Sequence, residues 1–563
     1  MNRIWKIKDS NPQLQTTLAN SLKISPIVAQ LLLNRGIEDE RAAYDFLYGE
    51  LDSCYDPHLL KDMDKSVARI RRAIREKEHI FLYGDYDVDG ITAVGLLSRV
   101  FAYLKANVTT YIPNRLEEGY GLNSEAVRLA HRKKVSLILT VDCGISAHKE
   151  IELANSLNID VIVTDHHEIK EGSLPKAYSI INPLREGCGY PFKHLTGVGL
   201  AYKLAQALLE GSPFALEEHL DLVALGTVSD LAVQKGENRI LTKNGLKKLS
   251  STKKAGIKAL IEVSGLEGKD INCGHIGYIL GPRINAMGRV GSPEVALRLL
   301  LTDDADEARR LAETLNRENR NRQKIESQVL GEAMEKIKRE INFKDLRVIV
   351  LSSPNWHVGV IGIVASRITD KFYRPTIMIA LEGNIGRGSG RSIDGFHMFD
   401  TINSCRELLL DFGGHEGACG LSIEKGNIDR FRDKINKLAK EQIRDEDLCP
   451  TLNIDVEVSL SDLTERLVEE LELLAPFGPE NPRPIFSSSN VYLKNEPKRI
   501  TRGGLKMWVT DNRITCEAIT FRAEGMSMPY KGSMVDLVYS PSINTWQGLS
   551  SLQLDLRDLK VIL

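Results

Sequence analysis

The eight cysteines of this 563-residue chain form no CxxC pair, and their scatter argues against both a zinc ribbon and a disulfide framework. Such usage is typical of a reducing compartment, so we expect a cytoplasmic protein. No apolar run approaches the roughly 18 residues that a membrane span requires. The first residues, MNRIWKIKDSNPQ, also lack the apolar segment of a secretory signal, and we therefore expect neither export nor membrane attachment.

The chain also has little net charge. Its 74 Lys and Arg residues against 76 Asp and Glu residues give −2 at pH 7. No overall field therefore draws the protein toward nucleic acid, and any such binding must use local basic patches. Apolar residues make up 42% of the chain and charged residues 27%, as in ordinary soluble proteins. The length predicts about three or four domains.

Helix-like and strand-like patterns divide the chain into five expected regions. Residues 1–60 are expected to be a helical or irregular N-terminal segment. In 61–302, apolar runs alternate with helix-length segments, which predicts a parallel sheet with helices packed on it. A connecting helix is expected over 303–342, and a second α/β domain over 343–444. Short strands over 451–563 predict a small β-barrel, so the expected fold class is α/β with a terminal barrel.

The segment YGDYDVDG at 83–90 places Asp85, Asp87 and Asp89 directly after an apolar run. A strand that ends in this way and turns into a helix is the usual place for a site in an open α/β sheet. Three carboxylates this close repel one another unless a cation lies among them. The alternatives are a solvated acidic turn and an EF-hand calcium loop. An EF-hand requires a glutamate where this chain has Leu96, and a helix rather than a strand before the loop.

Two further apolar runs end in ionisable groups, in the VDCG and TDHH segments at 141–144 and 164–167. Because parallel strands end at one edge of a sheet, we expect Asp142 and His166 to converge with the first motif. A capped turn with one buried imidazole is the alternative for the histidine pair alone. Asp230, in GTVSD, is a further candidate ligand, and an N-cap at a helix start explains it equally well.

This set of candidate ligands predicts the kind of metal. Carboxylates mixed with one or two imidazoles favour Mn²⁺ or Mg²⁺ over a sulfur-rich zinc site. Two divalent ions ~3.5–4 Å apart are what phosphodiester hydrolysis uses, since one activates water and both neutralise the charge that develops on the phosphate. The residues alone therefore predict a hydrolase of phosphate esters with divalent metal ions.

YGDYDVDG, VDCG, TDHH and GTVSD, in this order and spacing, resemble the four motifs of the DHH phosphoesterase family. The later segments LGPRINAMGRVG, NWHVGVIGIVASRI, GRGSGRS and FGGHEGACG resemble a single-strand-specific branch of that family. The resemblance covers nearly the whole chain. It implies a parallel-sheet DHH domain, a long connecting helix, a second α/β domain called DHH-associated, and a C-terminal OB-fold-like β-barrel.

The resemblance implies two Mn²⁺ or Mg²⁺ ions and assigns residue roles. The expected metal ligands, with Asp142 bridging, are Asp85, Asp87, Asp89, Asp142, His166 and Asp230. The expected catalytic residues are Asp87, Asp89, Asp142, His166, His167 and His415. Asp85 and His167 could either ligate metal or lie behind the ligands. Tyr83 stands where pyrophosphatase-like members have a histidine, and a tyrosine is a poor ligand for these ions.

The resemblance also implies a set of DNA contacts. The contacts that it implies are Arg115, Asn285, Arg289, His357, Ser389 and Arg391, and residue type and spacing independently suggest Arg387, Arg317, Arg320, Lys324 and Trp508. The glycine-rich segment 386–392 is expected to offer exposed backbone N–H groups as well as phosphate-binding arginines, although a plain loop is the alternative. For Arg115 and His357, taken alone, an ordinary surface or structural residue is the competing interpretation.

Two of these groups have support from residue spacing. Arg317, Arg320 and Lys324 share one helix face, which fits either a DNA strand or a solvated surface. Trp508 lies among Lys498, Arg499, Arg502 and Lys506, and basic residues beside aromatic ones suit single strands. A place in the barrel core is the alternative for Trp508.

The implied function is that of a single-stranded-DNA-specific 5′→3′ exonuclease of recombination and repair. Arg115, Ser389 and Arg391 would grip the 5′-phosphate end and so fix the polarity of digestion. The family implies single-strand-binding protein and a helicase as partners, and we expect a monomer without membrane contact. The alternatives are a DHH-family hydrolase of short oligonucleotides and an inactive single-strand-binding scaffold.

Overall fold

The computed structural model of the protein describes residues 3–115, 118–169, 174–500, 503–521, 523, 526, 528–546 and 549–562. Arg502, one of the basic residues expected around Trp508, lies outside the described residues. The chain divides into two units. The larger unit comprises Ile7–Asn316 and Asn453–Leu563, and the smaller unit comprises Met1–Lys6 and Arg317–Leu452.

A five-stranded parallel sheet forms the centre of the larger unit. Its strands are β2 (His79–Gly84), β3 (Asn107–Tyr111), β4 (Leu137–Val141), β5 (Asp160–Thr164) and β6 (Ser179–Ile181). Their order is β3-β2-β4-β5-β6, and every neighbouring pair is parallel. The apolar runs predict β2, β4 and β5 correctly. They do not predict the edge strands, because β3 is polar and half-exposed and β6 is very short.

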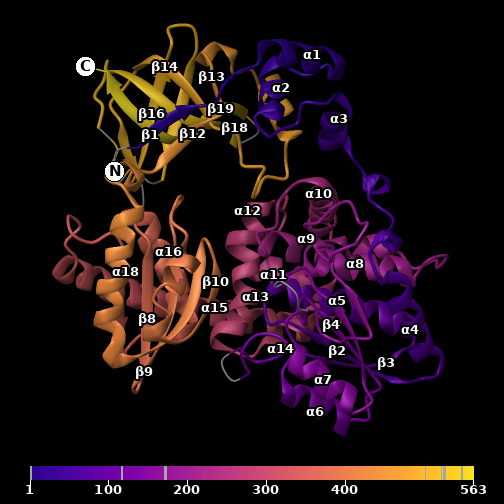
Figure 1. Cartoon of the computed structure of the whole chain (residues 1–563). Helices are drawn as coiled ribbons and strands as arrows, with labels where there is room; N and C mark the ends of the chain where they lie inside the picture. The colour runs from indigo at the N-terminus through magenta and orange to yellow at the C-terminus, as the bar shows by residue number, and fades with distance from the viewer. Residues whose placement is uncertain are drawn as a thin grey trace. The chain divides into compact units, whose positions relative to one another are not determined.

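Helices cover both faces of this sheet (Figure 1). They are α4 (Met63–Arg75), α5 (Val88–Tyr103), α6 (Ser124–Arg132), α7 (His148–Ser156) and α8 (Gly197–Leu208). Successive strand residues point to opposite faces, so β2 contributes to two cores. Ile80 and Leu82 pack with α4, α5 and α8, whereas Phe81 and Tyr83 pack with α6 and α7.

The region from 195 to 300 is helical, as expected. It contains α8, α9 (Leu220–Ser229), α10 (Gly236–Ser250), α11 (Ala255–Val263), α12 (Cys273–His275), a π-helical turn η4 (Ile276–Leu280), α13 (Gly281–Val290) and α14 (Pro293–Leu301). Nine of the ten residues of α9 are buried, because this helix packs against α5, α8 and α10 at once. The carboxyl end of α9 carries Asp230.

The N-terminal segment shares a hydrophobic core with the C-terminal barrel, which the sequence pattern does not predict. Its elements are β1 (Ile4–Ile7), α1 (Pro12–Leu22), α2 (Pro26–Leu33), α3 (Glu40–Tyr48), η1 (Leu51–Ser53) and η2 (Pro57–Leu59). Leu31 and Leu32 of α2 belong to the same core cluster as Phe486 and Leu537 of the barrel. The limits expected for the five regions of the chain stay a prediction.

The barrel itself contains the short strands that the sequence predicts. Its elements are β13 (Val456–Glu457), η8 (Leu460–Asp462), α19 (Glu465–Glu472), β14 (Phe486–Leu493), β15 (Lys498–Ile500), β16 (Gly504–Thr510), β17 (Thr515–Thr520), β18 (Met534–Trp546) and β19 (Leu549–Ile562). The preceding strand, β12 (Thr451–Ile454), pairs with β1 in a separate two-stranded sheet. The strand order is β13-β14-β18-β19-β17-β16-β15. An additional pairing of β14 with β16 closes the sheet into a barrel.

The smaller unit contains a mixed five-stranded sheet. The long helix α15 (Ala305–Glu340) leads into it, followed by β7 (Ile349–Ser353), α16 (Val358–Phe372), β8 (Thr376–Glu382), β9 (Ile385–Arg391), α17 (Met398–Asn403), β10 (Leu409–His415), β11 (Ala418–Glu424) and α18 (Ile428–Gln442). The strand order is β10-β11-β9-β8-β7, and only β7 and β8 are parallel. Helices α15 and α16 pack on one face, and α17 and α18 pack on the other. Among the described residues, no helix is long and apolar enough to cross a membrane.

A buried ion pair joins α8 to α10 and gives a test of this fold. Lys203 Nζ lies 2.7 Å from Glu237 Oε1, and their side chains are 0% and 1% exposed. Lys203→Met leaves the Glu237 carboxylate buried without its cation, so we predict a loss of about 3–5 kcal/mol in the free energy of unfolding. Urea denaturation measures the change.

The matched control is Lys247→Met, since Lys247 is exposed on α10. We predict that it changes the free energy of unfolding by less than about 0.5 kcal/mol. Equal effects of the two substitutions would contradict the structural role of the buried pair.

Candidate metal centre

The carboxyl ends of β2, β4 and β5 are neighbours, because these three strands are adjacent in the parallel sheet. Asp85, Asp87 and Asp89 follow β2, and Asp142 follows β4. Asp165, His166 and His167 follow β5. The expectation that these strand ends converge is therefore correct.

Their side chains form one continuous cluster of potential metal ligands. Three groups have ligand atoms that all lie within 4.8 Å of one another: Asp85, Asp87 and Asp142; Asp142, His166 and His167; and Asp89, His166 and Asp230. Asp142 and His166 each belong to two groups, so the three groups are linked. The cluster contains all six residues that the sequence proposes as metal ligands, together with His167.

Three polar atoms at the centre of this cluster lack hydrogen-bond partners. Asp85 Oδ1, Asp142 Oδ1 and His166 Nε2 are buried and have no hydrogen-bond partner among the described residues. His166 Nε2 lies 3.1 Å from Asp142 Oδ1, and 3.9 Å from an oxygen of Asp89 and of Asp230. A buried polar atom left unpaired costs about 1–3 kcal/mol. A divalent cation coordinated by these atoms removes that cost, and oxygen ligands with an imidazole suit Mn²⁺ or Mg²⁺.

The carboxylates repel one another strongly. Burial, together with the charge of Asp87, raises the pKa of Asp89 to about 7. Burial and the charges of Asp89 and Asp87 raise the pKa of Asp230 to about 8. The pKa values of Asp85 and Asp142 also lie well above the usual range, mainly because of burial. The cluster therefore favours a bound cation over four separate negative charges.

The two adjacent histidines have opposite electrostatic environments. Burial and the charge of His167 lower the pKa of His166 to about 4, so His166 is a neutral imidazole suited to ligation. Burial acts to lower the pKa of His167 as well, but the hydrogen bond and charge of Asp165 outweigh it and raise that pKa to about 9. His167 Nδ1 lies 2.6 Å from Asp165 Oδ1. The Asp165 carboxylate thus favours the protonated form of His167.

Asp165 fixes the geometry behind these histidines, a role that the sequence analysis does not predict. Its Oδ1 accepts the N–H of His167 at 3.0 Å, and its Oδ2 accepts the N–H of Ile145 at 2.9 Å. Burial opposes ionisation of Asp165, but its hydrogen bonds with His167 and Ile145 lower the pKa. Its place as the first residue after the strand in the TDHH segment is the only sequence signal for this role.

The turn after β2 is built by its own aspartates. Asp87 caps α5, and its carboxylate accepts the N–H groups of Asp89 at 2.9 Å and Gly90 at 3.1 Å. Leu96 is buried within α5, and a strand precedes the turn. The EF-hand alternative is therefore wrong.

The N-terminus of α8 also holds a carboxylate of the cluster. Gly197 N and Val198 N donate to the two oxygens of Asp89, at 2.6 and 2.9 Å. The positive end of a helix stabilises a negative charge placed there. A Cβ atom on Gly197 would lie 2.5 Å from Asp142 Cβ, and one on Gly226 would lie 2.9 Å from Asp89 Oδ1. These two glycines thus make room for the cluster. Gly226 is the first residue of the GTVSD segment, whereas none of the motifs contains Gly197.

Two aspartates differ from ordinary expectations for their positions. Asp230 lies at the carboxyl end of α9, so the alternative in which it caps the start of a helix is wrong. Asp142 has a φ of 61°, in the left-handed region that non-glycine residues rarely adopt. Strained backbone of this kind clusters at functional sites, where the surrounding structure compensates its cost.

Several expected DNA contacts of the larger unit lie beside the turn after β2. The Arg115 guanidinium lies over the Tyr86 ring, 5.2 Å from its centroid. Asn285 and Arg289 are four residues apart on α13. That helix packs on the same turn, because a Cβ on Gly288 would lie 3.1 Å from the Tyr86 carbonyl oxygen.

The glycine-rich segment of the smaller unit is a strand, which corrects one expectation. β9 lies between β8 and β11, so the sheet ladders occupy its backbone N–H groups and leave none exposed for phosphate. Gly386, Gly388 and Gly390 face the core, where a Cβ on Gly388 would lie 2.7 Å from Leu421. The opposite face of β9 is more exposed and carries Arg387, Ser389 and Arg391.

Arg391 and the two expected histidines of this unit have defined local roles. Arg391 donates to Ser389 Oγ at 3.2 Å and to the Gly390 carbonyl at 2.7 Å. His357 caps α16, and its Nδ1 accepts the N–H of Gly359 at 3.0 Å. His415, at the end of β10, is exposed and accepts the N–H of Gly417 at 3.2 Å. Their roles in catalysis or DNA binding stay predictions.

The remaining candidates are exposed as a binding role requires. Arg317, Arg320 and Lys324 are exposed on α15, and Arg317 pairs with Glu318 at 3.3 Å. Trp508 is 40% exposed on β16, so its assignment to the barrel core is wrong. Lys506, nearby on the same strand, is neutralised by Glu517 at 2.7 Å.

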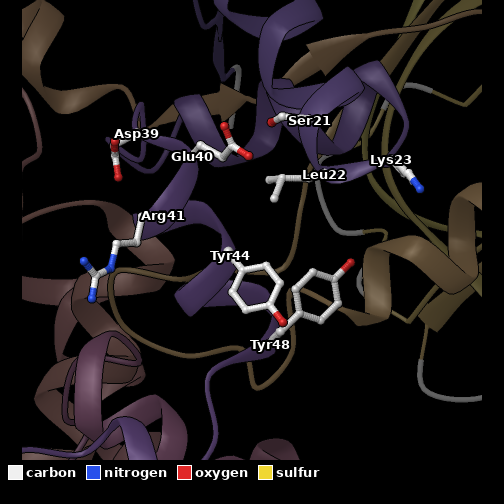
Figure 2. A pocket seen from close by; sticks show the side chains of 8 residues that line it. All are labelled: Ser21, Leu22, Lys23, Asp39, Glu40, Arg41, Tyr44 and Tyr48. Carbon is white, nitrogen blue, oxygen red and sulfur yellow. The ribbon is translucent and has the colours of Figure 1, made fainter.

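A separate pocket of about 580 Å³ lies on α1 and α3 (Figure 2). Tyr44 and Tyr48 lie next to each other in it, with ring centroids 5.1 Å apart. Its lining includes the cations Lys23 and Arg41 and also the anions Asp39 and Glu40, so neither sign of charge dominates the pocket. None of the site residues predicted from the sequence lines this pocket.

Comparisons with known proteins find similarity along nearly the whole chain. Family models match the DHH family N-terminal domain over 79–227, the DHHA1 domain over 345–441 and the RecJ OB domain over 454–558. The single-stranded-DNA-specific exonuclease RecJ of Bacillus subtilis is 37% identical over 561 residues, which cover 99% of this chain and 71% of that protein. The RecJ of Escherichia coli is 35% identical, with 94% and 95% covered. The chain belongs to the RecJ family.

Solved RecJ structures agree with this conclusion. The crystal structure of RecJ in complex with Mn²⁺ from Thermus thermophilus has a TM-score of 0.84 at 30% identity, and the match covers 99% of this chain and 79% of that chain. The corresponding Mg²⁺ complex has a TM-score of 0.79 at 28% identity, with 99% and 78% covered. The expected fold class and the DHH resemblance are confirmed, and the acidic cluster fits the same two ions.

The raised carboxylate pKa values predict how Mn²⁺ stabilises the protein. Asp89 and Asp230 have folded pKa values of about 7 and 8, above their usual values near 4, so without metal they favour the folded state at low pH. That contribution is lost as the pH rises from about 4 to 8, while the ionised ligands bind Mn²⁺ more tightly. We predict that the rise in Tm on adding Mn²⁺ grows from about pH 5.5 to about pH 8.

Thermal denaturation with and without Mn²⁺ measures this rise at each pH. The control is Asp142→Ala, which removes the residue shared by two ligand groups and is predicted to lose most of the Mn²⁺-dependent rise. A rise in Tm that is constant or shrinks with increasing pH in the wild type would contradict the assigned ligands.

Proposed function

We propose that this protein is a metal-dependent exonuclease that removes nucleotides from the 5′ end of single-stranded DNA. The observation that supports it most is the set of linked ligand groups around Asp142, whose buried ligand atoms include some without hydrogen-bond partners. This set occurs in a chain that is related to RecJ over 99% of its length. The relatives' names specify single-stranded DNA. The 5′→3′ polarity comes from the family resemblance.

The chain's own residues have distinct parts in this reaction. Asp85, Asp87 and Asp142 would hold one ion, and Asp89, Asp142, His166 and Asp230 would hold the other, with Asp142 between them. Two such ions supply an activated water and neutralise charge on the phosphate. Asp165 favours the protonated form of His167, which lies against the same groups, so His167 can donate a hydrogen bond to a phosphate oxygen.

Arginine side chains are proposed to bind the 5′-terminal phosphate. Arg387 is exposed on β9, and Ser389 and Arg391 are half-buried on the same face of that strand, close to Gly362 of α16. Guanidinium groups match phosphate geometry with paired hydrogen bonds. Arg115 presents a further guanidinium over the ring of Tyr86, the residue between Asp85 and Asp87. His357 and His415, with Asn285 and Arg289, are proposed as additional contacts near the scissile phosphate.

The barrel and α15 are proposed to bind the rest of the single strand. Trp508 is exposed on β16 and offers a surface on which a base can stack. Arg317, Arg320 and Lys324 lie along one exposed face of α15 and can pair with successive phosphates. A duplex hides its base faces, so digestion of blunt duplex is proposed to be much slower.

The cellular setting is proposed from the family alone. The family resemblance implies a monomeric cytoplasmic enzyme that acts in DNA recombination and repair, with single-strand-binding protein and a helicase as partners. The rival functions are less well supported. A hydrolase of short oligonucleotides does not require a C-terminal barrel with an exposed Trp508. An inactive scaffold does not require the candidate metal ligands that this chain retains.

The test uses a single-stranded oligonucleotide labelled at its 3′ end, with Mn²⁺. We predict a ladder that shortens from the 5′ end. Asp142→Ala is predicted to reduce the rate by at least about 10³-fold, since it removes a ligand shared by both ions. Asp306→Ala, an exposed aspartate on α15, is the matched control and should leave the rate unchanged.

Each outcome separates the proposed functions. Binding without degradation by the wild type would favour the scaffold. A ladder that survives in Asp142→Ala would show that the ligand assignment is wrong. Equal rates on single strands and blunt duplex would contradict the proposed specificity.

A further inference from the structure

A polar network fixes the connection between β3 and α6, of which residues 112–115 and 118–123 are described. Glu118 is its centre. Glu118 Oε1 accepts the N–H of Asn114 at 2.8 Å, while Oε2 accepts the Tyr111 hydroxyl and Asn123 Nδ2, both at 2.8 Å. Asn123 also caps α6 by accepting the N–H of Ala126 at 2.8 Å. Both ends of the connection are thus tied to one carboxylate.

Tyr83 joins this network to the central sheet. Its hydroxyl donates to the Gly121 carbonyl at 2.8 Å and accepts from Asn123 Nδ2 at 3.2 Å. Its ring is fully buried and stacks on that of Tyr111, with centroids 5.5 Å apart and an interplanar angle of 16°. The two tyrosines are paired in register on β2 and β3. Tyr83 is therefore part of the support for this connection and belongs to none of the ligand groups.

The connection presents two exposed side chains to the metal centre. Arg115 lies over Tyr86, the residue between Asp85 and Asp87. The Tyr120 hydroxyl lies 3.2 Å from His167 Nδ1. Among the described residues, no hydrogen bond or ion pair engages the Arg115 guanidinium. A cation whose charge acts on Asp85 without forming an ion pair is available to an anionic group of the substrate.

We propose that Tyr83, Glu118 and Asn123 are positioning residues for the substrate's terminal phosphate. They hold the connection so that Arg115 and Tyr120 face the phosphate next to the metal centre. The identity of that substrate rests on the proposed function. The residue in the first position of the YGDYDVDG motif thus orders a substrate-binding segment in this chain, instead of coordinating metal.

Tyr83→Phe tests this role, because it removes the hydroxyl and keeps the buried ring. We expect the KM for 5′-phosphorylated single-stranded DNA to rise roughly five- to twentyfold, as for the loss of one or two hydrogen bonds. The kcat should stay within about twofold and the number of bound Mn²⁺ ions should be unchanged, since no ligand is altered. The KM for a 5′-hydroxyl oligonucleotide should rise less.

Matched controls separate positioning from general loss of structure. Tyr539→Phe removes another buried hydroxyl, bonded to Ser488 in the barrel, and should leave the KM unchanged. Glu118→Gln should reproduce the effect of Tyr83→Phe, since an amide cannot accept all three hydrogen bonds. Glu125→Gln, which changes an exposed carboxylate at the start of α6, should not.

A double variant tests whether Tyr83 acts through Arg115. If it does, adding Tyr83→Phe to Arg115→Ala should raise the KM by less than about twofold over Arg115→Ala alone, because what Tyr83 positions is already gone. Fully additive effects would overturn the proposal. An unchanged KM in Tyr83→Phe would overturn it as well, and so would a loss of bound Mn²⁺.

The binding of DNA keeps this test separate from the proposed function. Fluorescence anisotropy measures the Kd of a 5′-phosphorylated oligonucleotide in the Asp142→Ala background, where no turnover is needed. Tyr83→Phe should weaken binding roughly five- to twentyfold there as well. A wild type that binds but does not digest DNA would contradict the proposed function alone, whereas an unchanged Kd would contradict the positioning role alone.

Discussion

Repulsion among buried carboxylates is the constraint on which this structure depends. The ends of β2 and β4 and the end of α9 bring Asp85, Asp89, Asp142 and Asp230 together. Burial raises their pKa values and leaves ligand atoms without partners. Folding alone does not relieve this repulsion, but divalent cations do. The parallel sheet, the helix N-terminus at Asp89 and the close approach of Gly197 together keep the acids in place.

The same centre relies on residues behind the ligands. Asp165 holds His167 in its charged form, so the TDHH segment offers a neutral imidazole and a cationic one side by side. Tyr83 and Glu118 hold the connection that carries Arg115 to this edge of the sheet. Metal binding, charge stabilisation and the proposed contact with a substrate phosphate therefore depend on adjacent parts of one scaffold.

Sequence reasoning succeeds here where function follows from local pattern. Asp87 and Asp142 are recognisable because each closely follows an apolar run, and neighbouring strands bring them together. Contacts between distant segments are not visible in that way, so Gly197 beside Asp142 is missed. The segment containing Gly388 resembles a loop in sequence, because glycines occupy the positions that face the core, where Gly388 approaches Leu421. The alternation of apolar residues that identifies a strand is therefore absent. The core shared by α2 and the barrel is equally non-local.

The central claim is that the chain binds two metal ions bridged by Asp142. Electron paramagnetic resonance of the protein with two equivalents of Mn²⁺ tests it directly, since ions ~3.5–4 Å apart are magnetically coupled. The account predicts the multiline spectrum of a coupled pair in the wild type, and its loss in Asp142→Ala. Only the six-line signal of isolated Mn²⁺ in the wild type would contradict the account.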